Sequence, residues 1–365
     1  MNARNLIRNL SREPDPSAVE LLFVLTVVTI AAVVFFDFTN GFHDASNMIS
    51  TLVASRAISP AQSVLLVGSF TLLGPLIGGT AVANTIGSFV SIEDLQVFDG
   101  LRVLLCGLLG AIGWNLLTWW LGLPSSSSHA LVGGLTAAVT AGYGADHVVW
   151  GLAETLQGRP VGIAKVILAL VVSPLLGFVA GYLLHRLARL LLRAATPAIN
   201  RPLRRGQWLT AAALAFSHGT NDGQKGMGVI TLILVLTGHL DHFAVPFWVM
   251  ALSAATLTLG TTFGGWRIVR TVGFGLYKLR PLHGLNVQLA SGAVIFGASL
   301  FGGPVSTTHV VSTSIMGVGA SERPKAVRWQ RARDIVLAWL LTIPGAGVLA
   351  LLFWWLSRLL IAPSG

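Results

Sequence analysis

Charged side chains are scarce in this sequence of 365 residues. Asp, Glu, Lys and Arg make up 10% of it, whereas soluble domains carry about 25%. Hydrophobic residues account for 53% and the mean hydropathy is +0.74. This composition excludes an ordinary soluble domain and predicts a protein that crosses a membrane several times. The 41 glycines agree with that prediction, because glycine lets membrane helices approach one another closely.

Cysteine is almost absent, and Cys106 lies alone in an apolar segment. This excludes a disulfide framework and a metal site built from thiolates. The net charge of +10 does not indicate a nucleic-acid partner, because the basic residues lie in short loops between apolar runs. We expect no cleaved signal peptide, since the first apolar run continues past about 20 residues without a suitable small-residue site.

A polar stretch interrupts the apolar run that begins near Val19. Residues 40–47 read NGFHDASN, and residues 218–225 repeat their frame as HGTNDGQK. The two segments pair position by position: Gly41 with Gly219, His43 with Asn221, Asp44 with Asp222, and Asn47 with Lys225. Lipid cannot hydrogen-bond such groups, so they must face protein, water or a solute.

A second pair of motifs indicates that the chain is duplicated. Residues 124–129 read PSSSSH and residues 304–309 read PVSTTH. His129 follows Asp44 by 85 positions, and His309 follows Asp222 by 87. Two polar motifs repeated in order at nearly constant separation predict two homologous halves.

We therefore predict an all-α polytopic membrane protein with two inverted-topology repeats, broken helices and re-entrant hairpins. The predicted breaks fall at residues 37–47 and within 209–236, around the two Asp motifs. Residues 131–142 are too short to cross the bilayer as a helix, which favours a hairpin. The division is a tail over 1–16, a first repeat over 17–185, a cytoplasmic Arg-rich linker over 186–207, a second repeat over 208–358 and a tail over 359–365.

Basic residues predict the orientation in the membrane. The loops around residue 56 and over 186–205, 267–280 and 323–333 hold 16 of the 24 Lys and Arg. Placing all four loops in the cytoplasm requires five net crossings per half and both termini outside. An odd number of crossings also inverts the second half relative to the first.

Inverted halves with paired polar breaks are typical of secondary transporters. The Asp motifs offer carboxylate and amide oxygens for Na⁺, or a proton relay if His43 takes part. The hydroxyl motifs offer donors at helix starts, which suit an oxyanion. Three alternatives stay open. Asp37 is either a structural partner or a direct participant, Lys225 is either a ligand or a counter-ion, and His129 and His309 either bind or only cap.

The four motifs resemble the paired signatures of the inorganic phosphate transporter (PiT) family, over nearly the whole chain. The resemblance implies symport of inorganic phosphate with H⁺ or Na⁺ by alternating access, in a bacterial inner membrane. His43 stands where many sodium-coupled members have Asn, which resembles the bacterial branch associated with proton coupling or metal–phosphate uptake. A sulfate permease on the same scaffold is the alternative function, since the motifs do not separate the two anions.

The expected site combines the two kinds of motif. The residues predicted to bind phosphate are Ser126, Ser127, Ser128, Ser306, Thr307, Thr308 and Lys225. The residues predicted to bind the coupling ion are Asn40, His43, Asp44, Asn47, Asn221 and Asp222, with Na⁺ assigned to Asp44, Asn47 and Asp222 if sodium is used. We expect no cofactor, and a divalent metal complexed with phosphate and a homodimer are left open. An enzyme is not expected, because HExxH-type metal spacing is absent and the polar residues are duplicated symmetrically.

Overall fold

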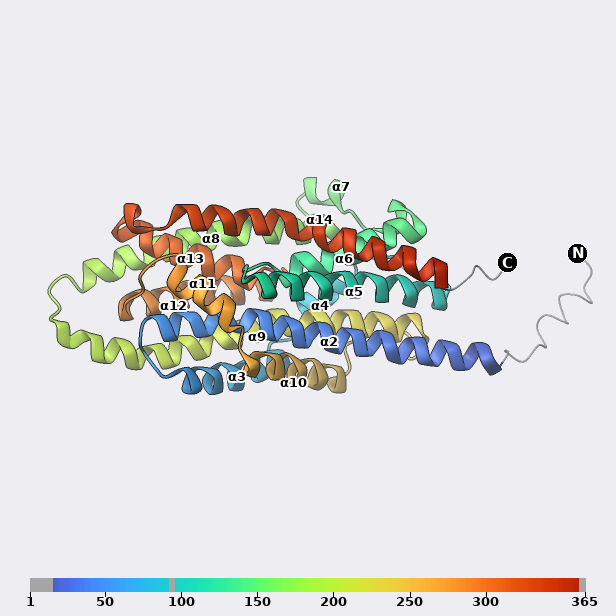
Figure 1. The fold of residues 1–365 in the computed structure, drawn as a ribbon, viewed down its shortest axis with the longest axis horizontal. Coiled ribbons are helices and arrows are strands. Elements are labelled where there is room, and N and C mark those ends of the chain that lie inside the picture. Colours follow the sequence, from blue (N-terminus) through green and yellow to red (C-terminus); the bar gives the residue numbers. More distant parts are fainter. Residues whose placement is uncertain (1–15, 92–95, 361–365) are drawn as a thin grey trace, which may run out of the picture.

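The computed structural model describes residues 16–91 and 96–360 and folds them almost entirely into helices (Figure 1). No β-strand occurs in these ranges, which contain one isolated bridge between Val90 and Val148. The predicted all-α class is confirmed. The helices are α2 (Pro16–Ala54), α3 (Pro60–Ile77), α4 (Ala81–Gly87), α5 (Val97–Leu121), α6 (Ser127–Tyr143), α7 (Leu152–Leu156), α8 (Gly162–Leu191), α9 (Asn200–Leu236), α10 (Phe247–Phe263), α11 (Trp266–Gly275), α12 (Pro281–Leu300), α13 (Thr307–Glu322) and α14 (Trp329–Leu360).

Long apolar helices confirm that the chain is a multi-pass membrane protein. Five of the described helices are long and apolar enough to cross a bilayer, or six if the bent pair α10–α11 counts as one span. Large apolar side chains lie exposed on these helices, such as Leu65 on α3 and Leu340 on α14. Contact with lipid rather than water explains that exposure. The expectation of five net crossings per half is wrong, because it requires ten spanning helices and the described residues contain five or six.

The two helices that carry the Asp motifs are continuous, so the predicted breaks at 37–47 and within 209–236 are wrong. Helix α2 runs without interruption from Pro16 to Ala54, and α9 runs from Asn200 to Leu236. Neither motif contains proline, which is the usual cause of a sharp kink. The polar side chains find partners on other helices and leave the hydrogen bonds of their own backbone intact. Polarity at membrane depth therefore marks the site without breaking the helix.

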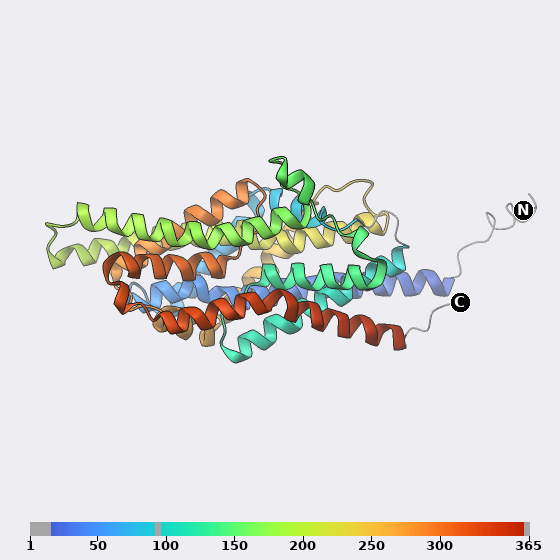
Figure 2. The ribbon, with the colours of Figure 1, turned by 90° about the horizontal axis from the view of Figure 1, so that it is seen from above.

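The chain is instead discontinuous at the two hydroxyl motifs. Residues 122–126 separate α5 from α6, and residues 301–306 separate α12 from α13. Each second helix starts with a serine cap: the Ser126 hydroxyl accepts from the backbone N–H of His129, and Ser306 does the same for His309. The α5–α6 and α12–α13 hairpins extend from opposite ends of the molecule toward its centre (Figures 1 and 2). Residues 131–142, predicted to form a hairpin, are instead part of the single helix α6, which pairs with α5.

The two halves interlock instead of lying side by side. Helix α3 packs against α9 while α10 packs against α2, and α8 packs against α13 while α14 packs against α6. The motif glycines permit part of this packing. A Cβ on Gly41 would collide with the Leu257 carbonyl of α10, and a Cβ on Gly219 would collide with the Thr71 carbonyl of α3.

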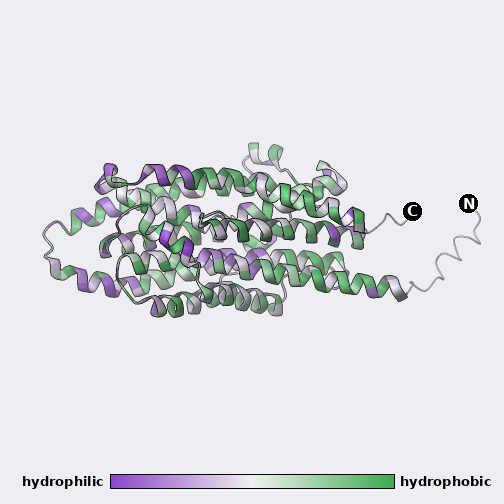
Figure 3. Cartoon of the chain, in the orientation of Figure 1, coloured by the Kyte–Doolittle hydropathy of each residue, from purple (hydrophilic) through white to green (hydrophobic). Residues whose placement is uncertain are grey.

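Corresponding helices run in opposite directions: α2 traverses the long axis one way and α9 returns (Figures 1 and 2). This arrangement supports inverted repeats, which stay a prediction together with the domain boundaries. The linker predicted over 186–207 is largely helical, since α8 ends at Leu191 and α9 begins at Asn200. Hydrophilic residues gather at the end of the molecule where these two helices meet, and along the middle of the bundle (Figure 3).

Candidate functional site

Asp44 of α2 lies at the centre of the bundle, where the two hairpin tips converge. It is 1% exposed. The hydroxyls of Thr308 and Thr307, from the second half, donate to its Oδ1 and Oδ2 at 2.9 and 3.2 Å. Ser127, from the first half, donates to Oδ2 at 3.3 Å. Three of the predicted phosphate ligands therefore surround this carboxylate in the structure.

Asp222 of α9 lies close to Asp44, and Asn40 joins the two carboxylates. With its amide nitrogen turned toward the acceptors, Asn40 donates to Asp44 Oδ2 at 3.2 Å and to Asp222 Oδ2 at 3.3 Å. The same nitrogen lies 2.7 Å from the Ser127 hydroxyl. Asn40 thus bridges two carboxylates, Asp44 and Asp222, that lie 178 positions apart in the sequence. We call this group, Asn40, Asp44, Asp222, Lys225 and the hydroxyls around Asp44, the central site.

Lys225 supplies the positive charge of the central site. Its side chain is fully buried, and its Nζ lies 2.7 Å from Asp222 Oδ1 and 3.4 Å from the Ser127 hydroxyl. His218 approaches the other oxygen of Asp222, with Nδ1 at 3.5 Å from Oδ2. In this conformation Lys225 is therefore a counter-ion of Asp222, within reach of a hydroxyl that faces the centre.

His43 lies between Asp44 and the tip of the α5–α6 hairpin. Its Nδ1 is 2.9 Å from Asp44 Oδ1 and its Nε2 is 3.3 Å from the Ser125 hydroxyl. Because a carboxylate can only accept, Nδ1 carries a proton and Nε2 is free to accept from Ser125. The Ser125 hydroxyl lies 2.7 Å from that of Thr118 on α5. His43 thus connects the carboxylate to a chain of hydroxyls that can pass a proton.

Asn221 occupies the matching position in α9 but does not reach the carboxylates. Its amide donates to the Ser299 hydroxyl at 2.9 Å and to the Gly303 carbonyl at 3.0 Å. Asn221 therefore holds the tip of the α12–α13 hairpin, as His43 holds the other tip. Asn47, predicted as an ion ligand, donates to the Thr308 hydroxyl at 2.9 Å and lies at the edge of the central site.

Residues 40–350 match the family model described as "Phosphate transporter family". A "Probable low-affinity inorganic phosphate transporter" of Bacillus subtilis is 38% identical over 343 residues, which cover 93% of this chain and 99% of the relative. One with the same description from Rhizobium meliloti is 41% identical over 341 residues, covering 93% and 98%. The chain belongs to the phosphate transporter family.

A solved structure described as "The sodium-dependent phosphate transporter" has the same fold. It superposes with a TM-score of 0.80 at 23% identity, covering 93% of this chain and 100% of that one. The arrangement of helices described above is therefore also found in an experimental structure.

In this member of the phosphate transporter family, the remaining predicted hydroxyls have other partners. Ser126 and Ser306 are occupied as helix caps. The Ser128 hydroxyl donates to the Val305 carbonyl at 3.0 Å and joins the two hairpin tips. The starts of α6 and α13 nevertheless meet at the central site, so the partial positive charges of both helix N-termini are directed toward it.

The histidines that follow these caps lie against each other with their rings tilted by 33°. The rings of His129 and His309 lie 4.7 Å apart, and His309 also stacks on Trp339 at 3.9 Å. Both rings are buried at the contact between the two hairpins. Their backbone N–H groups donate to the Ser126 and Ser306 hydroxyls, so the caps are the serines and not the histidine side chains. Whether the histidines bind or only cap stays a prediction.

Two contacts of motif residues at the candidate site were not predicted from the sequence. Ser125 contacts His43, although it stood in the PSSSSH motif and was left out of the predicted ligands. Gln224, in the second Asp motif, accepts from the backbone N–H groups of Val82 and Ala83 at 2.7 and 3.2 Å and caps α4. Its place in a duplicated motif was the available signal.

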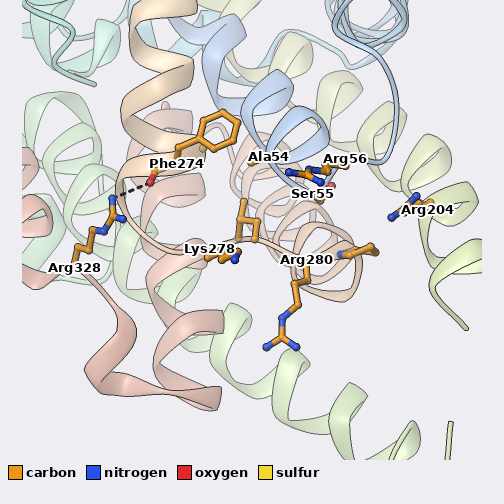
Figure 4. Close-up of a pocket in the computed structure, with 11 residues that line it drawn as sticks. Ala54, Ser55, Arg56, Arg204, Phe274, Lys278, Arg280 and Arg328 are labelled. Carbon is orange, nitrogen blue, oxygen red and sulfur yellow. Dashed lines mark hydrogen bonds between the residues drawn. The ribbon is translucent and has the colours of Figure 1, made fainter. Parts of the chain in front are cut away.

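A basic cavity of about 570 Å³ lies at the end of the molecule where α2 finishes and α9 begins (Figure 4). Each of the four basic loops of the sequence contributes to its lining, and no carboxylate does. The basic residues that line it are Arg56, Arg204, Lys278, Arg280 and Arg328. Arg328 donates to the Phe274 carbonyl at 3.1 Å, and Arg204 approaches from α9 on the opposite side (Figure 4). The four loops therefore meet at one end of the molecule, and that this end is cytoplasmic stays a prediction.

Buried amides separate the basic cavity from the central site. Gln207 of α9 accepts from the Ser55 hydroxyl at 2.8 Å and donates to the Pro281 carbonyl at 3.0 Å. Gln288 of α12 donates to the Thr51 hydroxyl at 3.0 Å. Both glutamines are fully buried. Thr51 and Ser55 follow Asp44 by two and three helical turns on one face of α2, so the network lies directly along that face.

Proposed function

We propose that this chain is a secondary transporter that carries inorganic phosphate together with a cation across the bacterial inner membrane, by alternating access. The observation that carries the proposal is the central site itself. Two carboxylates, one ammonium group and hydroxyl donors from both hairpin tips meet there, and every one of these residues is at most 2% exposed. A buried polar site shared by two interlocked halves fits a substrate that is released alternately to either side.

The hydrogen bonds suggest how phosphate and cation are coupled. Ser127, Thr307 and Thr308 now donate to Asp44. A phosphate oxyanion binds such donors and the Lys225 ammonium. When those donors turn to phosphate, Asp44 and Asp222 lose their partners and face an added negative charge. Binding is then favourable only if a cation or a proton neutralises the carboxylates at the same time.

A proton is the coupling ion that His43 favours. An imidazole can take up and release a proton, and the ring of His43 touches both Asp44 and the Ser125 hydroxyl. Sodium coupling is the second candidate, because Asp44, Asp222 and Asn47 offer oxygen ligands. The sulfate alternative finds no support, since the relatives reported above are named for phosphate.

We place the basic cavity in the cytoplasm, following the excess of Lys and Arg in cytoplasmic loops. Phosphate would leave the central site along α2, past Gln207 and Gln288, and reach this cavity. The homodimer and the contact with specific lipids stay predictions.

Uptake of labelled phosphate into proteoliposomes tests the proposal. A pH gradient and a Na⁺ gradient are imposed separately, and sulfate is offered as a competitor. We expect uptake that follows the pH gradient and resists sulfate. Ser127→Ala and Thr308→Val should both reduce uptake strongly, whereas Ser69→Ala, which removes an exposed hydroxyl bonded within its own helix, is the matched control. Absence of uptake under either gradient would refute the proposal.

A further inference from the structure

Asp37 is a buried carboxyl group that the central site does not use. It lies on α2, seven residues before Asp44 and therefore about 10 Å away along the helix axis. The side chain is 0% exposed, and neither carboxyl oxygen has a hydrogen-bond partner among the described residues. Ser253 of α10 lies beside it, but its hydroxyl also makes no hydrogen bond.

The pocket around Asp37 is shaped by a glycine. The carboxyl group packs directly on Gly226 of α9, where any Cβ would collide with both of its oxygens. Gly226 follows Lys225, but the Lys225 ammonium is bound to Asp222 at 2.7 Å. Helix α9 therefore leaves room for a carboxyl group at this position without supplying a donor to it.

No free cation faces Asp37 from the other helices that pack on α2. Helices α3 and α10 contain no titratable residue. The charged side chains that act on the Asp37 carboxyl group are Lys225 and Asp222 of α9. On α5, Arg102 and Cys106 face Ser357 of α14. The titratable groups of α11, α12 and α13 have other neighbours. Arg267 of α11 donates to the Trp120 carbonyl, and His309 of α13 stacks on Trp339. His283 of α12 and Glu322 of α13 contact each other.

An ionised carboxylate without a donor is strongly disfavoured in such an interior, whereas a protonated one needs no counter-charge. Na⁺ is a poor occupant, because it requires several oxygen ligands, and the hydroxyl named beside the Asp37 carboxyl group is that of Ser253. A proton requires one oxygen atom. The surroundings of Asp37 therefore fit the binding of a proton.

The position of Asp37 on α2 relates it to transport. Asp37, Asn40 and Asp44 share one face of the helix, at spacings of three and four residues. Asn40 contacts both carboxylates of the central site. The position equivalent to Asp37 in the second half is Ala215, seven residues before Asp222. Asp37 thus lies outside the duplicated frame that forms the central site, toward the end of α2 remote from the basic cavity.

We propose that Asp37 is a proton-binding residue, an inference that rests on the proposed phosphate transport. Asp37 accepts the coupled proton on the outer side of the membrane and exchanges it with the carboxylates of the central site. The proton binds to a carboxyl oxygen of Asp37 and leaves it by way of the polar face of α2. The phosphate itself does not touch Asp37.

Asp37→Asn tests this assignment, because the amide has nearly the same shape and cannot carry the proton. In proteoliposomes, we expect net phosphate uptake driven by a pH gradient to fall at least about tenfold, as loss of a proton-carrying group should. Exchange of external labelled phosphate for internal phosphate needs no net proton movement, and we expect it to stay within about twofold of wild type. Thr39→Val, which removes a hydroxyl bonded within its own helix, should leave both activities unchanged.

An infrared measurement supplies a direct readout. The C=O stretch of a protonated carboxylic acid should be present in the wild type and lose intensity in Asp37→Asn. Gradient-driven net uptake at the wild-type level in Asp37→Asn would overturn the proposal. The proposal would also be overturned if Asp37→Asn unfolded at the same temperature as the wild type but lost exchange and net uptake to the same extent. If wild-type uptake follows Na⁺ and ignores the pH gradient, the proton assignment is overturned while phosphate transport stands.

Discussion

Removal of Asp222 should reveal how strongly the central site depends on its ion pair. In Asp222→Asn, the Lys225 ammonium keeps its charge but loses the carboxylate that lies 2.7 Å away. The Asn side chain keeps a carbonyl oxygen that can accept a hydrogen bond but carries no negative charge, and the other acceptor beside Lys225 is the Ser127 hydroxyl at 3.4 Å. Because Lys225 is fully buried, water cannot replace the lost partner. Breaking a buried pair by removing one member typically costs about 3–5 kcal/mol.

That cost is a large share of the stability of a folded protein, which is about 5–15 kcal/mol. We therefore expect Asp222→Asn to lower the Tm in detergent by about 5–10 °C and to abolish phosphate uptake. Asp241→Asn is the matched control, since Asp241 is exposed in the loop after α9 and its loss should change neither property.

The double variant Asp222→Asn/Lys225→Met separates the two effects. It removes both charges and keeps a side chain of similar length, and replacing a whole buried pair is often neutral. We expect its Tm to recover to within about 2 °C of wild type while uptake stays absent. A Tm of Asp222→Asn equal to that of wild type would refute the ion pair. Recovery of uptake in the double variant would refute the need for these charges in transport.

Three further variants test other parts of the structure. His43→Asn should keep the protein folded and reduce uptake driven by a pH gradient more than it reduces phosphate binding; equal losses in transport assays and binding titrations would make His43 an orienting group. Burial raises the pKa of Glu322, but the positive charges of His283 and Arg280 outweigh it and lower that pKa below its usual range. Its contribution to stability, about 1–3 kcal/mol, is therefore present at neutral pH and lost as the pH falls through the lowered pKa. The Tm difference between wild type and Glu322→Gln should thus vanish in acid, and a constant difference would contradict the shift. In a Cys106→Ala background, Asn200→Cys should react only with probes on the cytoplasmic side, and labelling by an impermeant external reagent would reverse the proposed orientation.

The sequence predicted the members of the central site better than the path of the chain. Duplication of the Asp motif predicted that Asp44 and Asp222 belong to one site, and both carboxylates meet at Asn40. The breaks expected at these motifs are absent, because a polar side chain disrupts a helix only when its own backbone loses hydrogen bonds. The short length of residues 131–142 predicted correctly that this segment does not cross the bilayer by itself, but it forms one helix, α6, and turns back on α5 instead of forming a hairpin alone.

The partner of each hydroxyl could not be predicted from the sequence. Ser126 and Ser127 are adjacent and chemically identical, yet one caps a helix and the other faces Asp44. Which does which depends on where α6 starts and how the hairpin tip meets α2. The partner of Asn221 could not be predicted either. It donates to the Gly303 carbonyl, which lies in the break between α12 and α13.

The charges inside the bundle argue for coupled transport independently of any single residue. Asp37, Asp44 and Asp222 are buried. Among the described residues, the buried basic side chain beside them is Lys225. If all three carboxyl groups were ionised, two negative charges would remain uncompensated in a medium where charge interactions are strong. A phosphate dianion would add two more. The empty protein must therefore already hold protons or cations near these groups, on the carboxyls or on His43 and His218, and each bound phosphate requires further ones. A carrier with this interior cannot move phosphate as a bare anion, so net phosphate uptake down a phosphate gradient should carry H⁺ or Na⁺ into the vesicle with it. Net phosphate uptake accompanied by neither cation would contradict this argument.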